Sequence, residues 1–104
     1  MTPEITIRPQ DREIVRNILL AVLPPENRRI FVFGSRARGT QKRAADLDLA
    51  IDLGRPVSTK EEFELKDQFE ESDLPYRVDV IDLNTISQHF RELIQPDFLE
   101  FPLD

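Results

Sequence analysis

The hydrophobic and polar positions of this chain follow two different periods, and the longer period predicts a helix near the N-terminus. Between residues 11 and 23, apolar side chains recur three and four residues apart, which is typical of an amphipathic helix. The stripe consists of Ile14, Val15, Ile18, Leu19, Val22 and Leu23. Asp11 is a candidate cap for this helix, and Pro24 and Pro25 would stop it.

Three short runs predict β-strands. Residues 29–33, RIFVF, are β-branched and aromatic and are closed by Gly34, which favours a strand buried on both faces. Residues 46–53 alternate at their start between acidic and apolar side chains, as a strand does, and Gly54 ends them. Residues 76–83 form a third run, in which acids occupy positions that would otherwise belong to the core.

Two further helices are expected. Ser58 and Glu61 have the spacing of a capping box, which opens a helix that runs to about Ser72, and Asn84 or Ser87 can cap a last helix that ends at a proline. Their apolar side chains are Phe63, Leu65 and Phe69 in the first helix, and Ile86, Phe90, Leu93 and Ile94 in the second. The order helix, strand, strand, helix, strand, helix predicts a small α+β fold, with helices covering a mixed β-sheet.

Composition narrows the class of protein. The 104 residues suffice for one compact core but not for two, so residues 1–104 are expected to form a single domain. The net charge of −6 repels a nucleic-acid backbone, so direct nucleic-acid binding is not expected. The chain has no cysteine, which excludes disulfides and thiolate chemistry. Neither a signal peptide nor an apolar stretch of the ~20 residues needed to span a membrane is present, so we expect a soluble, cytoplasmic protein.

Three aspartates form a candidate metal site. Residues two apart on a strand share a face, so Asp46 and Asp48 project together with Cα atoms about 6.6 Å apart. Two carboxylates this close repel unless a cation lies between them, and Mg²⁺ prefers carboxylate oxygens together with substrate phosphates. If the third strand lies beside the second, Asp79 joins the pair, and three acids can hold two metal ions about 3.5–4 Å apart. Taken alone, Asp46 and Asp48 fit a solvated edge strand equally well.

A glycine-serine turn supplies a candidate phosphate site. Gly34 lets the backbone approach a phosphate, a helix begun just after it would aim N–H groups at the same anion, and Ser35 adds a hydroxyl. The basic patch of the chain lies in the same stretch and consists of Arg36, Arg38, Lys42 and Arg43. Because Arg36 and Arg38 are two residues apart on the expected helix, they point in different directions and are not expected to share one ligand.

Other candidate motifs are rejected. Gly34, Gly39 and Thr40 imitate a P-loop, but the lysine that this motif needs before its hydroxyl residue is missing. The acids of residues 46–52 lack the spacing, glycine and final glutamate of an EF-hand loop. His89, the one histidine, is expected on the surface of the last helix without a catalytic role. The one tyrosine of the chain, at position 76, is expected to begin the third strand.

The combined pattern resembles the minimal nucleotidyltransferases of the DNA polymerase β-like superfamily. That family has a glycine-serine at a strand-to-helix turn, Asp-x-Asp about a dozen residues later, and a third aspartate on an adjacent strand. The matching segments here are FGSRARGT, ADLDLAI and RVDVIDL. The resemblance extends over nearly the whole chain, from EIVRNILLAVLPP to FRELIQPDF, and implies a polymerase β-like nucleotidyltransferase fold for residues 1–104.

The resemblance also implies a reaction. A nucleoside monophosphate, AMP when the donor is ATP, is transferred from a nucleoside triphosphate to an acceptor hydroxyl, and pyrophosphate leaves. Asp46 and Asp48 would hold two Mg²⁺ ions. Asp79 would bind the metal ion nearer the acceptor and favour deprotonation of its hydroxyl.

Further residues take roles from the same resemblance. Gly34 and Ser35 would hold the β- and γ-phosphates. Arg38 is assigned to the nucleotide on a different ground, because its charge could neutralise phosphate beside the turn. Asp82, which points to the face of the strand opposite Asp79, is given a structural or capping role. The family commonly has serine before the aspartate pair, and Ala45 in its place is expected to affect the rate more than the type of reaction.

The resemblance implies a partner protein as well. Short members of this family look like the antitoxin half of pairs whose other half is a helical HEPN ribonuclease or a related substrate-binding protein, and some attach AMP to a tyrosine of that partner. A helical acceptor protein in a hetero-oligomer is therefore implied. Two alternatives stay open: a non-catalytic module that masks a helical partner by contact alone, and transfer to a small molecule or RNA, which the small acidic surface disfavours.

The C-terminal tail is apolar but irregular. Its apolar residues are Phe98, Leu99, Phe101 and Leu103. We expect them to pack over the core of the chain itself, whereas an exposed patch of this kind would mark a partner interface.

Overall fold

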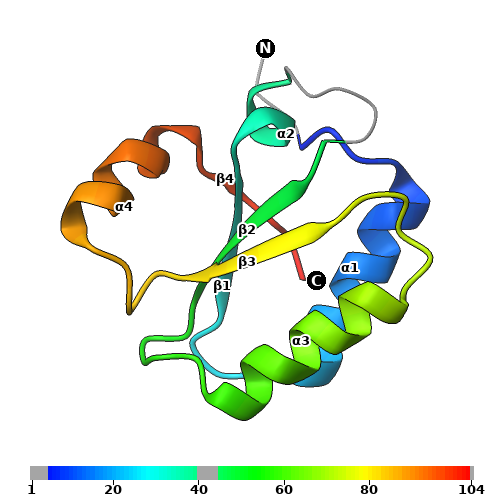
Figure 1. Ribbon diagram of the computed structural model, residues 1–104, viewed down its shortest axis with the longest axis horizontal. Helices are drawn as coiled ribbons and strands as arrows, with labels where there is room; N and C mark the ends of the chain where they lie inside the picture. The colour runs from blue at the N-terminus through cyan, green and yellow to red at the C-terminus, as the bar shows by residue number, and fades with distance from the viewer. Residues whose placement is uncertain (1–4, 40–44, 104) are drawn as a thin grey trace.

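A four-stranded β-sheet and its helices make up the described part of the protein, residues 5–39 and 45–103 of a computed structural model (Figure 1). Within these residues the elements are α1 (Pro9–Val22), β1 (Arg29–Phe33), α2 (Ser35–Arg38), β2 (Leu47–Asp52), α3 (Thr59–Glu71), β3 (Val78–Asp82), α4 (Gln88–Ile94), the 3-10 helix η1 (Gln95–Asp97) and β4 (Leu99–Glu100). The expected α+β class with a mixed sheet is confirmed. None of the helices in these ranges combines the length and apolarity needed to cross a membrane.

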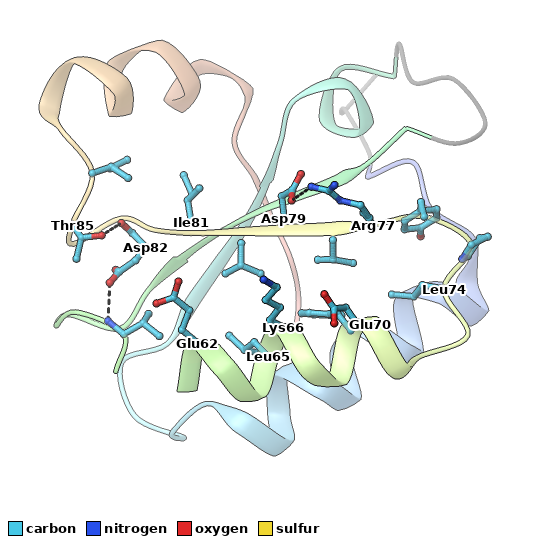
Figure 2. Close-up of a pocket in the computed structure, with 17 residues that line it drawn as sticks. Glu62, Leu65, Lys66, Glu70, Leu74, Arg77, Asp79, Ile81, Asp82 and Thr85 are labelled. Carbon is cyan, nitrogen blue, oxygen red and sulfur yellow. Dashed lines mark hydrogen bonds and ion pairs between the residues drawn. The ribbon is translucent and has the colours of Figure 1, made fainter. Parts of the chain in front are cut away.

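The sheet has the strand order β3-β2-β1-β4. β1 is antiparallel to both β2 and β4, whereas β2 and β3 are parallel. Helices α1 and α3 lie side by side on one face of the sheet, and α4 lies beyond the other face (Figures 1 and 2). The two faces of the central strands therefore meet different surroundings.

The core lies between the sheet and the α1/α3 layer. Leu47, Leu49 and Ile51 of β2 point into it and are each fully buried. The predicted stripe of α1 is confirmed, since its members are all buried or packed against the buried cluster. Because side chains alternate along a strand, Asp48 and Asp52 lie on the opposite face of β2. Burial of the apolar set thus aims these acids away from the core.

Asp11 does not cap α1, contrary to expectation. The helix begins at Pro9, which suits a first helical position, and Asp11 lies within the first turn. Only 1% of Asp11 is exposed, and its carboxylate accepts hydrogen bonds from Arg8 and from the Tyr76 hydroxyl. Tyr76 itself precedes β3, so the expectation that it begins this strand is wrong.

The capping box of α3 is confirmed in both of its hydrogen bonds. The Ser58 hydroxyl accepts from the Glu61 amide, and the Glu61 carboxylate accepts from the Ser58 amide. Of its apolar side chains, Leu65 and Phe69 are buried, but Phe63 is 69% exposed. At about 100° per residue, Phe63 lies on the side of the helix away from Leu65.

β1 is buried on one face only, which corrects the expected burial on both. Ile30 and Val32 are buried, while Phe31 and Phe33 are half-buried on the other face. The ring of Phe98 stacks on Phe31 at 4.9 Å between centroids. The C-terminal tail therefore packs on the sheet, as expected.

The sequence did not predict the short strand β4, which pairs with β1 and is followed by the buried Phe101. Ser87 caps α4 through the Phe90 amide, as one of the two expected caps. No residue of α4 is buried, and Leu93 is 63% exposed, so the predicted stripe of this helix is only loosely packed.

Candidate active site

Asp48 and Asp79 lie opposite each other on the neighbouring parallel strands β2 and β3. Both therefore project from the same face of the sheet, the face away from α3. Asp79 is held by Arg77, whose Nη2 donates a hydrogen bond to Oδ1 at 3.1 Å (Figure 2). The expectation that the third strand lies beside the second is confirmed.

Asp46 precedes β2 and lies two residues before Asp48. Burial of the Asp48 carboxyl, and then the negative charges of Asp79 and Asp46, raise the pKa of Asp48, and Arg38 opposes the shift. Three carboxylates thus interact electrostatically around Asp48. A bound cation would relieve the repulsion among them.

The glycine of the turn lies directly against this acid. A Cβ atom added to Gly34 would collide with Oδ2 of Asp48. Gly34 also has φ +73°, a region that side chains rarely adopt. Because position 34 is glycine, the turn can lie directly against Asp48 of the acid pair.

The helix expected after the turn is present as α2, with only four residues. It begins at Ser35, and the amides of Ala37 and Arg38 both donate to the Gly34 carbonyl. Gly39, with φ +74°, ends it in the left-handed region. The predicted candidates Gly34 and Ser35 thus stand at its N-terminal end, beside Asp48.

Arg36 is buried and has a structural role, so it is not part of an exposed basic patch. It is 5% exposed and donates from Nε and Nη2 to the Ala45 carbonyl, at 3.0 and 2.8 Å, and from Nη1 to the Thr6 carbonyl at 3.1 Å. Its guanidinium lies 3.9 Å from the centroid of the Tyr76 ring. Arg36 therefore ties α2 to the residue just before Asp46, a role that sequence reasoning missed because its signal lies in tertiary contacts.

Arg38 remains at the surface, where Nη1 forms an ion pair with Asp97 at 2.7 Å. Its side chain is 52% exposed, and its charge reaches Asp48. Arg38 is thus the described member of the patch that can turn toward a ligand. The other candidates, Lys42 and Arg43, together with Thr40, lie outside the described residues.

The structure agrees with the roles that the sequence predicted for Asp82 and His89, a structural or capping role and a surface position. Asp82 points away from Asp79 and accepts hydrogen bonds from the amides of Val57, at 2.7 Å, and Asn84, at 2.9 Å. Asp82 therefore holds the loop before α3 and the turn after β3. His89 is exposed on α4.

The donors at this site are carboxylates, which suit a hard cation. Within the described ranges, no group of three His, Cys, Asp or Glu side chains is gathered closely enough to hold a metal ion. The hydrogen bond from Arg77 holds Asp79 in the present arrangement. Assignment of Asp46, Asp48 and Asp79 to metal binding therefore stays a prediction.

The fold and site together define a nucleotidyltransferase. Residues 22–96 match the family described as "Polymerase beta, Nucleotidyltransferase". The chain is 40% identical over 92 residues to the probable protein adenylyltransferase MntA of Haemophilus influenzae, covering 88% of this chain and 79% of that protein. It is 34% identical over 82 residues to a putative protein adenylyltransferase of Methanocaldococcus jannaschii, covering 79% and 87%. The chain belongs to the polymerase β-type nucleotidyltransferase family.

Solved structures share the fold. A toxin-antitoxin structure with AMP-PNP superposes with a TM-score of 0.72 at 24% identity, over 88% of this chain and 73% of that one. A mutant MntA-HpeT toxin-antitoxin structure gives 0.69 at 20% identity, over 88% and 71%. At these identities the likeness supports the architecture alone.

Proposed function

We propose that this protein transfers AMP from ATP to a side-chain hydroxyl of a partner protein. The observation that carries the proposal is the position of Asp48, which faces Asp79 across β2 and β3 and touches the turn at Gly34. Acidic and phosphate-binding elements then adjoin one another, as phosphoryl transfer requires. Both curated relatives are named as protein adenylyltransferases, which supports AMP as the group transferred.

The acids have distinct roles in this proposal. Asp46 and Asp48 would hold two Mg²⁺ ions, and Asp79 would complete the site on the acceptor side. The ions, when bound, neutralise the charge that develops on the phosphates. The acceptor oxygen forms a bond to the α-phosphorus while the bond from this phosphorus to the bridging oxygen breaks, and pyrophosphate leaves. Asp79 favours loss of the hydroxyl proton, which passes to solvent.

The turn and the nearby arginine would hold the triphosphate. Backbone N–H groups at Gly34 and Ser35, with the Ser35 hydroxyl, are proposed to bind the β- and γ-phosphates. Arg38 is half-exposed and would exchange its ion pair with Asp97 for a phosphate oxygen. Ala45 contributes its carbonyl to Arg36, a contact that does not need a serine hydroxyl.

The acceptor is proposed to be a tyrosine of a helical HEPN-type partner, with this protein as the antitoxin in a cytoplasmic hetero-oligomer. The two relatives named as protein adenylyltransferases support a protein acceptor, and the solved structures that share the fold are of toxin-antitoxin pairs. Residues 1–104 are proposed to act as one nucleotidyltransferase domain. A second candidate, masking of the partner by contact alone, is favoured by the hydrogen bond that holds Asp79 to Arg77.

The two candidates are separated by labelling. The protein, its helical partner, Mg²⁺ and ATP labelled at the α-phosphate are incubated together, and label on the partner is measured by gel and mass spectrometry. Transfer is expected with the native chain and with Asp67→Asn, an exposed control on α3, but not with Asp48→Asn. Absence of transfer, together with neutralisation of the partner by Asp46→Ala/Asp48→Ala, would establish masking instead.

A further inference from the structure

Among the residues that the structure describes, β3 is an edge of the sheet, with no strand paired on its outer side. On the inner side, the Arg77 carbonyl accepts from Leu47, and the Leu83 amide donates to Ile51. Because backbone groups alternate along a strand, the N–H and C=O groups of Val78 and Val80 point outward. The outer side of β3 can therefore pair with another extended chain.

A groove of about 1040 Å³ runs along this edge, between β3 and α3 (Figure 2). Its apolar lining includes Leu65 and Phe69 of α3 and Val78 and Val80 of β3. Leu65 and Phe69 are buried, so the floor of the groove is packed, while the two valines are half-buried. A groove between a helix and an unpaired strand suits an extended peptide that adds to the sheet.

The lining is acidic. It includes four carboxylates and two basic side chains: Glu62, Glu70, Asp79 and Asp82, and Lys66 and Arg77. Glu62 and Glu70 are exposed on α3, and Figure 2 shows them pointing from the helix toward β3. The charge of the groove therefore complements a basic segment and disfavours a second copy of this acidic edge.

The groove also reaches the candidate active site, since Asp79 lines it. Asp79 and Ile81 project from β3 on the side away from α3 (Figure 2). In a strand added to β3, alternate side chains would point toward α3 and toward the side of Asp79. A side chain of the second set would lie next to the catalytic carboxylate, while its two neighbours entered the apolar groove.

We propose that the acceptor protein presents its hydroxyl on an extended, basic segment that pairs with β3 as a fifth strand of the sheet. The acceptor residue stands between two apolar residues, whose side chains pack beside the half-buried Val78 and Val80. This inference rests on the proposed function and deepens it, because it names the type of segment that the enzyme modifies. Backbone pairing supplies affinity, and the alternation of side chains supplies selectivity.

Two synthetic peptides test the alternation. The first has one tyrosine between two valines, with lysines toward both ends and a fluorescent label. The second has the same composition with the tyrosine and one neighbouring valine exchanged. Binding of both is measured by fluorescence anisotropy in the presence of Mg²⁺ and AMP-PNP, and transfer by mass spectrometry with Mg²⁺ and ATP. Transfer to the first peptide at least tenfold faster than to the second is expected, and equal rates would overturn the proposal.

Two variants test the edge itself. Val80→Pro removes an N–H group that points outward from the sheet. Proline is tolerated at such a position of an edge strand, and Val80→Ala is the control that keeps this donor. At least a tenfold loss of peptide affinity is expected for Val80→Pro beyond that of Val80→Ala. Since proline can also disturb folding, the exposed pair Glu62→Gln/Glu70→Gln provides a second test, for which weaker binding of the basic peptide is expected. Native affinity in both Val80→Pro and the glutamine pair overturns the proposal.

The outcomes separate this inference from the function on which it rests. If the native chain binds the peptide, Val80→Pro abolishes this binding, and no acceptor is modified, the groove is a peptide-binding site and the proposed enzymatic activity is contradicted. If AMP is transferred to the full partner and neither variant slows this transfer, the enzymatic activity is supported and binding of the acceptor at β3 is contradicted. Dimerisation of the chain through β3, detected by light scattering and abolished by Val80→Pro, would assign the edge to a second copy and overturn the proposal.

Discussion

Gly34 lies so close to Asp48 that a single methyl group on Gly34 would overlap the Asp48 carboxylate. The contact brings the turn at the end of β1 against the acid in the middle of the candidate site. It depends on the antiparallel pairing of β1 with β2, in which Phe33 lies opposite Asp48. The spacing between the turn at Gly34 and the acid is thus set by the sheet.

We predict that Gly34→Ala reduces kcat/KM about 100-fold, because a displaced carboxylate misaligns the reacting groups. Gly39→Ala is a control at a similar φ, +74°, where no atom of the described residues beyond its chain neighbours lies within 4 Å of an added Cβ. The backbone strain differs between the two variants. Gly39 has ψ 19°, in the left-handed region where a side chain costs about 1–2 kcal/mol, whereas Gly34 has ψ −156°, a region nearly confined to glycine, so Gly34→Ala is expected to lose more stability in thermal unfolding. Equal activity losses in the two variants would mean that the contact with Asp48 is unimportant.

Replacement of Asp48 by asparagine should separate stability from activity. Because the pKa of Asp48 is raised in the folded protein, the native state binds its proton more tightly, and stability falls as the pH rises from about 3.9, an ordinary aspartate pKa, through the raised value. Without metal, Asp48→Asn should lack this loss, and the difference from the native chain should grow across that window. Urea unfolding at several pH values measures it.

Mg²⁺ should stabilise the native chain but not Asp48→Asn. A metal ion that binds the folded site stabilises the native chain by mass action, whereas Asp48→Asn loses this effect. Activity of the variant should fall at least about 100-fold, as for loss of a group that supports a metal. Equal Mg²⁺-induced shifts in Tm for both proteins would place the metal elsewhere.

The ion pair between Arg38 and Asp97 should compete with nucleotide binding. Arg38→Ala is predicted to raise the KM for ATP about tenfold, since a hydrogen bond between charged groups contributes about 1.5 kcal/mol or more. Asp97→Asn releases Arg38 and should leave KM unchanged or lower it. Because the pair is at the surface, its loss should change the free energy of unfolding by less than about 1 kcal/mol. Steady-state kinetics with ATP varied distinguish the two variants.

Tyr76 offers a direct optical test, because it is the one tyrosine in a chain without tryptophan. Burial of the phenol, and then the negative charge of Asp11, raise the pKa of Tyr76 to about 12. The absorbance of the phenolate, followed at roughly 295 nm, reports ionisation of Tyr76. We expect a midpoint near pH 12 in the folded protein and near pH 10 in denaturant. Since the folded pKa is raised, stability should be lost between about pH 10 and 12. Titration of the folded chain near 10 would contradict the buried contact with Asp11.

The hydrophobic pattern was sufficient to predict the elements that contain long or well-bounded apolar repeats. The stripe of α1 and the capping box of α3 are local signals, and the structure confirms both. The two-residue β4 has no such signal and exists only because β1 offers it an edge. The sequence shows that Phe63 is apolar but not which side of α3 meets the sheet, and the structure leaves this side chain exposed.

The sequence by itself determined the chemistry of the candidate site: glycine and serine at a turn, and acids on alternate positions of strands. These are properties of residue type and short spacing. Only the tertiary structure decided which acids meet, because Asp48 and Asp79 are distant in the chain and the β2–β3 register brings them together. It likewise buried Arg36 while leaving Arg38 at the surface, since burial depends on where Thr6, Ala45 and Tyr76 lie around the short helix.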